Sequence, residues 1–166
     1  MPNFTPYNRQ MRATDFALVE YREELPGPED FLRLFAAADW RTSATPEQIA
    51  GALAAAWYSV VAYAPAAERA SEAAATGDDS PRLIAMGHIL SDGVIHAYIA
   101  DVIVDPEWQG RGVGREVMRR LVARCEEAGI ESIQLFAAPG KARFYEKLGF
   151  SARSPEAPGM ELRPQP

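Results

Sequence analysis

The sequence has 166 residues, of which 48% are hydrophobic and 24% are charged, and this composition is typical of a soluble globular protein. A chain of this length predicts a single domain, residues 1–166, that buries a sizeable core. The formal net charge of −6 argues against nonspecific binding to nucleic acid or to an anionic membrane. The single cysteine, Cys125, excludes an intrachain disulfide and a cysteine-based zinc site, and we interpret it as a small buried hydrophobic residue.

The sequence predicts neither a signal peptide nor a membrane span. The first residues, MPNFTPYNRQM, have no apolar central region of the kind that signal peptides carry. The longest apolar stretch, residues 52–67, is short for a membrane span and is interrupted by Pro65. We therefore expect a cytoplasmic protein. Both of its two histidines fall in strand-like runs, so we expect no histidine-rich metal site.

The first part of the chain predicts a strand, two helices and a second strand. Residues 17–22, ALVEYR, favour a strand. One helix is expected to begin at Pro28, because proline followed by acidic residues favours a helix start, and a second is expected after Thr45 as its N-cap. Residues 58–64, YSVVAYA, favour a strand. Residues 66–81 are small and charged and end in Gly and Pro, which predicts an exposed connection.

The next part predicts a hairpin followed by a helix. Residues 82–90 and 94–104 favour two strands joined by a tight turn. The helix is expected to run from Val113 to Ala128 and to end at Gly129. Its apolar face at helical spacing consists of Val113, Val117, Leu121 and Val122.

A strand at 132–138, a short helix at 140–149 and a short tail strand at 160–163 complete the pattern. Strands that alternate with helices in this order predict an α/β (α+β) fold. We expect a mixed central sheet of six to seven strands, flanked by helices on both faces.

Three glycines lie between the expected strand at 94–104 and the helix after it, in residues 105–115, DPEWQGRGVGR. A loop without Cβ atoms lets a ligand approach the backbone, and a helix start presents unpaired N–H groups, so together they favour a phosphate site. Arg111 and Arg115 add positive charge there. The spacing G-x-G-x-G fits neither the G-x-x-x-x-G-K-[ST] loop nor the G-x-G-x-x-G fingerprint. The alternative interpretation is a plain glycine-rich turn.

Two motifs together resemble the GCN5-related N-acetyltransferase (GNAT) family. Gln109, Gly112 and Gly114 fill its acetyl-coenzyme-A motif Q/R-x-x-G-x-G/A, after the apolar strand. Residues 143–150, RFYEKLGF, resemble its second motif, aromatic-Tyr-x-x-x-Gly-Phe, at the expected distance of one helix and one strand. The resemblance covers residues 82–150, which we predict to be the acetyl-CoA-binding core.

The resemblance implies contacts of two kinds with the donor, acetyl-CoA. In this family the strand before the loop separates from its neighbour and its backbone pairs with the pantetheine arm, here through Val102, Ile103 and Val104. The diphosphate would be bound by the amides and the two arginines of the loop, Gln109, Gly110, Arg111, Gly112, Val113, Gly114 and Arg115. For the arginines the alternative is a solvated helix face, which Arg119, Arg120 and Arg124 continue.

The sequence departs from the family at one position. Ala138 stands where many members have an asparagine that contacts coenzyme A. Pro139 and Gly140 shape the turn into the last helix instead, which leaves the amides of Gly140 and Lys141 as candidates for cofactor contact.

Tyr145, in the second motif, is the predicted general acid. Acetyl transfer expels a coenzyme A thiolate, and a phenol with an ordinary pKa of about 10 is protonated at neutral pH and able to protonate that sulfur. The assignment follows from the resemblance, and the alternative is a core tyrosine in an amphipathic helix.

Asp101 is the candidate general base, because a carboxylate inside the strand IADVIV must be paired or functional. The alternatives are ordered water as the base and a structural role for Asp101. Strand alternation places His96 on the opposite face. Glu23 and Glu24 are weaker candidates for binding an ammonium group.

We expect an acyltransferase that moves the acetyl group of acetyl-CoA to a primary amine by direct attack in a ternary complex, without a metal. The acceptor is a small-molecule amine or a peptide amine. A non-catalytic acetyl-CoA sensor is the alternative, and a longer acyl donor or a protein N-terminus as acceptor is a third. A homodimer is common in the family.

Overall fold

The computed structural model describes residues 19–65 and 81–162. The chain divides into two compact units, residues 1–135 and 136–166. The predicted exposed connection, except for residue 81, lies outside the described residues, as do the first two residues of the strand expected at 17–22. The single domain therefore stays a prediction.

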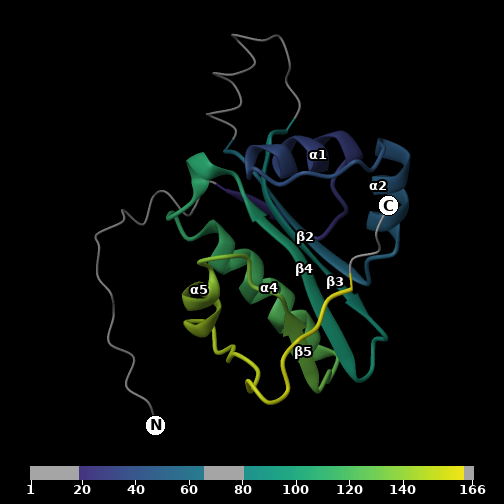
Figure 1. Cartoon of the computed structure of the whole chain (residues 1–166). Helices are drawn as coiled ribbons and strands as arrows, with labels where there is room; N and C mark the ends of the chain where they lie inside the picture. The colour runs from purple at the N-terminus through teal and green to yellow at the C-terminus, as the bar shows by residue number, and fades with distance from the viewer. Residues whose placement is uncertain (1–18, 66–80, 163–166) are drawn as a thin grey trace. The chain divides into compact units, whose positions relative to one another are not determined.

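The first unit contains one mixed sheet, with the strand order β1-β2-β3-β4-β5. Its strands are β1 (Glu20–Arg22), β2 (Tyr58–Tyr63), β3 (Leu83–Ser91), β4 (His96–Val104) and β5 (Ser132–Leu135). The first four pair antiparallel, and β5 pairs parallel to β4. This confirms a mixed sheet with α/β architecture (Figure 1).

The described sheet has five strands, so the prediction of six to seven was wrong. The expected tail strand is absent from residues 160–162, the part of it that the structure describes. Met160 and Leu162 are 88% and 89% exposed, and a strand gains stability only when its apolar face is buried and its backbone is paired.

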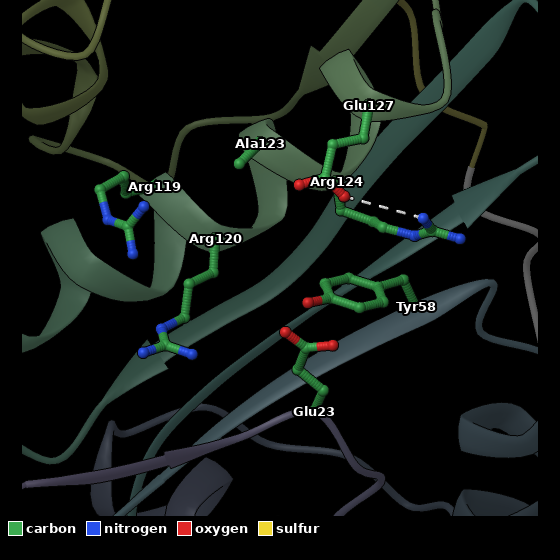
Figure 2. A pocket seen from close by; sticks show the side chains of 7 residues that line it. All are labelled: Glu23, Tyr58, Arg119, Arg120, Ala123, Arg124 and Glu127. Carbon is green, nitrogen blue, oxygen red and sulfur yellow. Dashed lines mark ion pairs between the residues drawn. The ribbon is translucent and has the colours of Figure 1, made fainter.

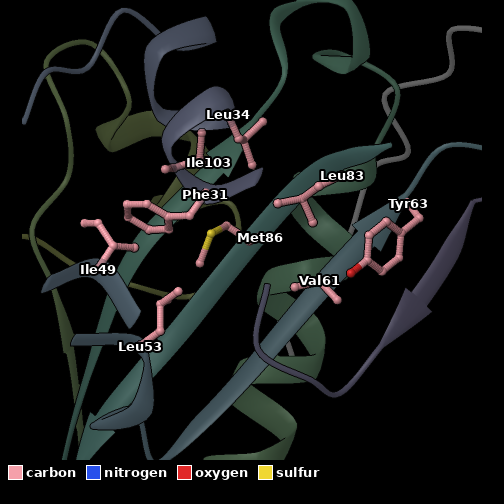
Figure 3. Close-up of a cluster of buried hydrophobic side chains, with 9 residues drawn as sticks. All are labelled: Phe31, Leu34, Ile49, Leu53, Val61, Tyr63, Leu83, Met86 and Ile103. Atoms are coloured by element: carbon pink, nitrogen blue, oxygen red, sulfur yellow. The ribbon is translucent and has the colours of Figure 1, made fainter. Parts of the chain in front are cut away.

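Two helices cover one face of the sheet. These are α1 (Pro28–Ala37) and α2 (Pro46–Ala54), and both begin with proline. The predicted N-cap Thr45 is confirmed, because its hydroxyl accepts from the Gln48 amide while the Gln48 side chain accepts from the Thr45 amide. Their apolar side chains pack on the strands in the cluster of Figure 3: Phe31, Leu34, Ile49, Leu53, Val61, Tyr63, Leu83, Met86 and Ile103.

Helix α4 (Val113–Glu127) contacts β2, β3 and β4 and connects the parallel strands β4 and β5. Its predicted bounds are confirmed to within one residue, and Gly129 follows its end with φ 69°. Val113, Val117 and Leu121 are buried as predicted, together with Met118 and Cys125, whereas Val122 is only partly buried. A Cβ atom on Gly87 of β3 would meet Val117 and Leu121, so the odd-numbered side of β3 at this point faces α4.

Strand β4 contains a bulge at its centre. Residues 101–102 of β4 together lie opposite the single residue Gly87 of β3. Asp101 has φ 47°, in the left-handed region that side chains other than glycine seldom adopt. Just before the bulge, the ladder between β4 and β5 ends at the pair of Ile99 with Leu135. The remainder of β4, residues 100–104, extends past β5 without a ladder partner on that edge in the described chain.

The second unit is small. Its helix α5 (Ala142–Glu146) is shorter than the helix expected at 140–149, and it is followed by Gly149 with φ 93°. Phe136 lies against Gly159, where a Cβ atom would be 2.9 Å from its ring.

Candidate functional site

The loop between β4 and α4 is shaped by Asp105. The Asp105 carboxylate is buried, accepts from the Glu107 amide at 3.0 Å, and thereby caps the short 3-10 helix η2 (Pro106–Trp108). Arg82 donates to Asp105 at 3.0 Å and to Glu107 at 2.9 Å. The Asp105 amide donates to the Ile84 carbonyl of β3, so the loop starts from a fixed point at the end of the sheet.

Two of the three glycines in this loop have a backbone conformation that favours glycine. Gly110 has φ 74°, and Gly112, the N-cap of α4, has φ 84°. Gly112 has no side chain to cap the helix, so no side-chain cap bond closes the first turn of α4. The loop therefore leads directly into a helix start with the local geometry predicted for an anion site.

The arginines of the loop differ in their surroundings. The Arg111 guanidinium lies 4.7 Å from the ring centroid of the buried Trp108, which positions it beside the loop. Arg115 is exposed, and no ion pair is found for it among the described residues. Arg119 and Arg120 of the same helix pair with Glu116 at 2.7 and 2.9 Å. Ligand contact by Arg111 and Arg115 stays a prediction.

The end of β4 provides a backbone edge beside this loop that has no strand partner among the described residues. Val102, Ile103 and Val104 all lie past the last pair with β5, and the Ile103 side chain is buried in the core cluster. The Gln109 side chain donates to the Val104 carbonyl at 3.0 Å, so it ties the loop to the strand. An extended molecule placed along this edge would find backbone groups to pair with, as in strand addition.

Asp101 lies at the bulge, where this edge begins. Its side chain is 33% exposed, and burial raises the pKa of its carboxyl group while the nearby His88 imidazole lowers it. Oδ2 of Asp101 is 3.9 Å from Nδ1 of His88, on β3. The sequence reasoning missed His88, although an imidazole within the apolar run RLIAMGHIL is the same signal that singled out Asp101.

Tyr145, Gly140 and Lys141 belong to the second unit. Tyr145 is half-buried in α5, with its ring centroid 5.0 Å from that of Phe144 and 6.2 Å from that of Phe150. Gly140 has φ 75°, and Lys141 is the N-cap of α5 and donates its amide to the Ala138 carbonyl. The roles predicted for these three residues stay predictions.

A hollow of about 360 Å³ lies elsewhere on the first unit, between the exposed face of α4 and β2 (Figure 2). It is lined by Glu23, Tyr58, Arg119, Arg120, Ala123, Arg124 and Glu127. Burial and a hydrogen bond with Glu23 raise the pKa of Tyr58 to about 12. Three arginines outnumber two glutamates here, so the surroundings of Glu23 do not favour an ammonium group. None of the residues predicted to bind the donor or to act in catalysis lines this hollow.

The remaining candidates are Glu24, His96 and Cys125, and each contacts residues that belong to the fold. The Tyr63 hydroxyl donates to Glu24 at 3.0 Å. His96 is exposed at the start of β4, 3.3 Å from Asp92 of the preceding turn. Cys125 is buried, and burial raises the pKa of its thiol, so the interpretation as a small hydrophobic residue is confirmed.

The fold, the unpaired strand edge and the glycine loop agree with the family that the two motifs indicate. The Acetyltransferase (GNAT) family matches residues 21–150, most of the chain. The chain therefore belongs to the GNAT acetyltransferase family, and the resemblance drawn from its motifs is confirmed.

Individual relatives and solved structures agree. The chain is 39% identical over 88 residues to the uncharacterized N-acetyltransferase ycf52 of Porphyra purpurea, covering 53% of this chain and 51% of the relative. It is 45% identical over 76 residues to serotonin N-acetyltransferase 2, chloroplastic, of Oryza sativa subsp. japonica, covering 46% and 38%. The chain thus spans about half or less of these relatives. A probable acetyltransferase of meticillin-resistant Staphylococcus aureus has the same fold, with a TM-score of 0.71 and 24% identity, covering 88% of this chain and 99% of that chain.

The comparisons contradict the predicted cytoplasmic location. The Oryza sativa relative and two GCN5-related N-acetyltransferases of Arabidopsis thaliana are named as chloroplastic. Composition and the absence of a recognised targeting signal were therefore insufficient grounds for that prediction. In the described ranges, no helix is long and apolar enough to span a membrane.

Proposed function

We propose that this protein transfers the acetyl group of acetyl-CoA to a primary amine by direct attack within a ternary complex. The observation that carries the proposal is the continuous arrangement of an unpaired β4 edge, a glycine loop and an uncapped helix start. The edge suits the amide-bearing pantetheine arm, and the helix start suits the diphosphate. Membership of the GNAT family supports the same donor.

The donor site consists of three sets of residues. Val102, Ile103 and Val104 offer backbone groups to the pantetheine arm. The diphosphate is bound by the loop and the start of α4, residues 109–115, with Arg111 and Arg115 supplying positive charge. The amides of Gly140 and Lys141 complete the set assigned to the donor.

The reaction needs one base and one acid. The amine nitrogen gives up a proton to the Asp101 carboxylate and attacks the thioester carbonyl carbon, so that a C–N bond forms. The C–S bond then breaks, and the Tyr145 hydroxyl protonates the leaving thiolate. A carboxylate whose pKa is raised by burial is a better proton acceptor than an ordinary aspartate, which suits Asp101 to this role.

The acceptor belongs to the class of primary amines. One relative is named for serotonin, whose side chain ends in a primary amine, and another, from Glycine max, is named a histone acetyltransferase. These names support testing both arylalkylamines and lysine-containing peptides as acceptors.

An amine-panel assay tests the proposal. The purified protein is incubated with acetyl-CoA labelled in the acetyl group and with single amines, and both labelled product and free thiol are measured. We expect equal amounts of product and thiol for at least one amine, and no thiol release above background without an amine. If a folded protein that binds acetyl-CoA acetylates none of the amines, the proposal is overturned and the acetyl-CoA sensor is favoured instead.

A further inference from the structure

A row of polar side chains crosses the centre of the sheet on the face covered by α1 and α2. Ser59 on β2 and His88 on β3 are direct cross-strand partners, and they are only 5% and 7% exposed. The side chain of Gly87 would face α4, so its neighbour His88 faces the opposite layer. Asp101 of β4 continues this row through its contact with His88.

Some polar atoms of this row lack a hydrogen-bond partner among the described residues. Nδ1 of His88 and Oγ of Ser59 are buried, and neither has a hydrogen-bond partner within the described chain. Buried polar groups that serve only the fold are nearly always hydrogen-bonded, because an unpaired one costs about 1–3 kcal/mol. Placing an imidazole here therefore reduces the stability of the fold, and a purely structural role does not account for it.

The backbone also holds Asp101 in an unfavourable conformation. Its φ of 47° lies in the left-handed region, and the β4 bulge puts it opposite Gly87 together with Val102. A conformation of this kind costs about 1–3 kcal/mol and is found where the surrounding structure demands it, often at functional sites. Here it places the carboxylate within 3.9 Å of the His88 imidazole, at the point where β4 leaves β5.

Burial and the partner's charge have opposite effects on the pKa of each of the two groups. Burial lowers the pKa of His88 and raises that of Asp101, while the charge on each partner acts in the opposite direction. The other charged groups on the elements packed against this face are accounted for. Arg33 of α1 pairs with Asp30 and donates to the Leu83 carbonyl, and Glu29 and Glu47 are exposed.

We propose that His88 is a positioning residue whose imidazole packs beside the Asp101 carboxylate and tunes its electrostatic surroundings, while Asp101 alone takes the proton from the acceptor amine. The proposal rests on the proposed function, because it assigns a partner to the proposed base. In the step, the amine proton moves to Asp101, the neutral carboxyl group lies beside a neutral imidazole, and the proton leaves to water after the acetylated product departs. No group is oxidised or reduced, and the base returns to its starting charge.

The closing experiment compares four variants with the amine identified by the panel assay. His88→Gln removes the imidazole and keeps a polar side chain, and Asp101→Asn removes the carboxylate charge. His96→Gln is the matched control, since His96 is the other histidine of the chain and is exposed at the far end of β4. Ser59→Ala tests whether the row extends to β2. For each, kcat and KM are measured across pH 6–10, together with acetyl-CoA affinity and thermal stability.

For H88Q we expect an unchanged acetyl-CoA affinity and a fall in kcat of roughly tenfold to a hundredfold at neutral pH. The apparent pKa of the kcat profile should move, and the loss should shrink at high pH, where the free amine is already deprotonated. H96Q should match the wild type, and S59A should stay within about twofold of it. A folded H88Q with the wild-type kcat and pH profile would overturn the inference, as would an H88Q whose only change is weaker acetyl-CoA binding.

An NMR titration of the histidine ring protons reports on the pair without any turnover. The signals of the two histidines are assigned with H96Q, in which only those of His88 remain. Because the Asp101 charge raises the pKa of His88, D101N should lower that pKa by at least about half a pH unit. An unchanged His88 titration in D101N would overturn the inference even if no His88 variant folds. If the wild type acetylates none of the amines, the proposed function is overturned, and this inference is overturned together with it.

Discussion

Val102 and Gly87 lie opposite each other at the β4 bulge, so close that a Cβ atom on Gly87 would be 3.3 Å from Cγ2 of Val102. The same atom would be 2.8 Å from Cδ1 of Leu121 and 3.2 Å from Cγ1 of Val117, both in α4. The close approach of helix, bulge and neighbouring strand therefore depends on the absence of a side chain at one position in β3.

Gly87→Ala should destabilise the fold by about 1–3 kcal/mol, because three surrounding side chains must move to admit one methyl group. Urea unfolding at neutral pH measures this change. Gly51→Ala is the matched control: Gly51 lies within α2, and nothing lies within 4 Å of its added Cβ. That change should stabilise the protein by up to about 1 kcal/mol through helix propensity. Equal effects of the two substitutions would contradict the packing argument.

The glycine at the start of α4 should be needed for donor binding as well as for backbone conformation. Gly112→Ala places a side chain at φ 84°, and Gly129→Ala does so at φ 69°, at the other end of the same helix. Each should cost about 1–2 kcal/mol of stability. Only Gly112→Ala should raise the Kd for acetyl-CoA, by about tenfold or more, which corresponds to about 1.4 kcal/mol.

Calorimetric titration of both variants with acetyl-CoA measures this difference. If the two glycine variants bind the donor equally well, the loop is a plain turn rather than a diphosphate site.

Tyr145→Phe should lower kcat by about a hundredfold, since a general acid typically contributes that much or more. The ring contacts with Phe144 and Phe150 do not require the hydroxyl and should be kept in the variant. Steady-state assays with the best amine measure kcat and KM. Tyr63→Phe is the control, because it loses one hydrogen bond to Glu24 and about 0.5–1.5 kcal/mol of stability while turnover stays unchanged. A fully active Tyr145→Phe would remove this residue from the mechanism.

Asp92 should make stability depend on pH in the acid range. Its carboxylate accepts from the amides of Val94, His96 and Ile95, and these bonds hold its pKa well below the ordinary value. Because the folded pKa lies below the unfolded one, the stabilisation is complete above the ordinary aspartate pKa of about 4 and is lost as pH falls through the folded value.

We therefore expect Asp92→Ala to be less stable than the wild type at neutral pH, and the two stability curves to converge as the pH falls below about 4. Urea unfolding at a series of pH values measures both curves. Parallel curves across the whole pH range would show that the Asp92 charge does not contribute to the free energy of unfolding.

Elements with strong local signals were predicted well. The N-cap at Thr45 and most of the apolar stripe of α4 depend on a few neighbouring residues, so their prediction required no knowledge of the rest of the fold. The tail strand at 160–163 was predicted wrongly, because alternation over a few residues does not show whether a partner strand is available. His88 was missed for a related reason, since a histidine in a strand has meaning only through the residue across the ladder.

The sequence by itself determined the family, the loop that suits a diphosphate, and a carboxylate within an apolar strand, because each is a local arrangement of residue types. Tertiary structure alone decided that Asp101 meets His88, thirteen positions earlier in the chain, at 3.9 Å. It also decided that the ladder between β4 and β5 ends at Ile99, just before the bulge, among the described residues. Both depend on strand register, which follows from which strand faces are buried and from the turns between strands, so it is settled only when the strands are assembled in the sheet.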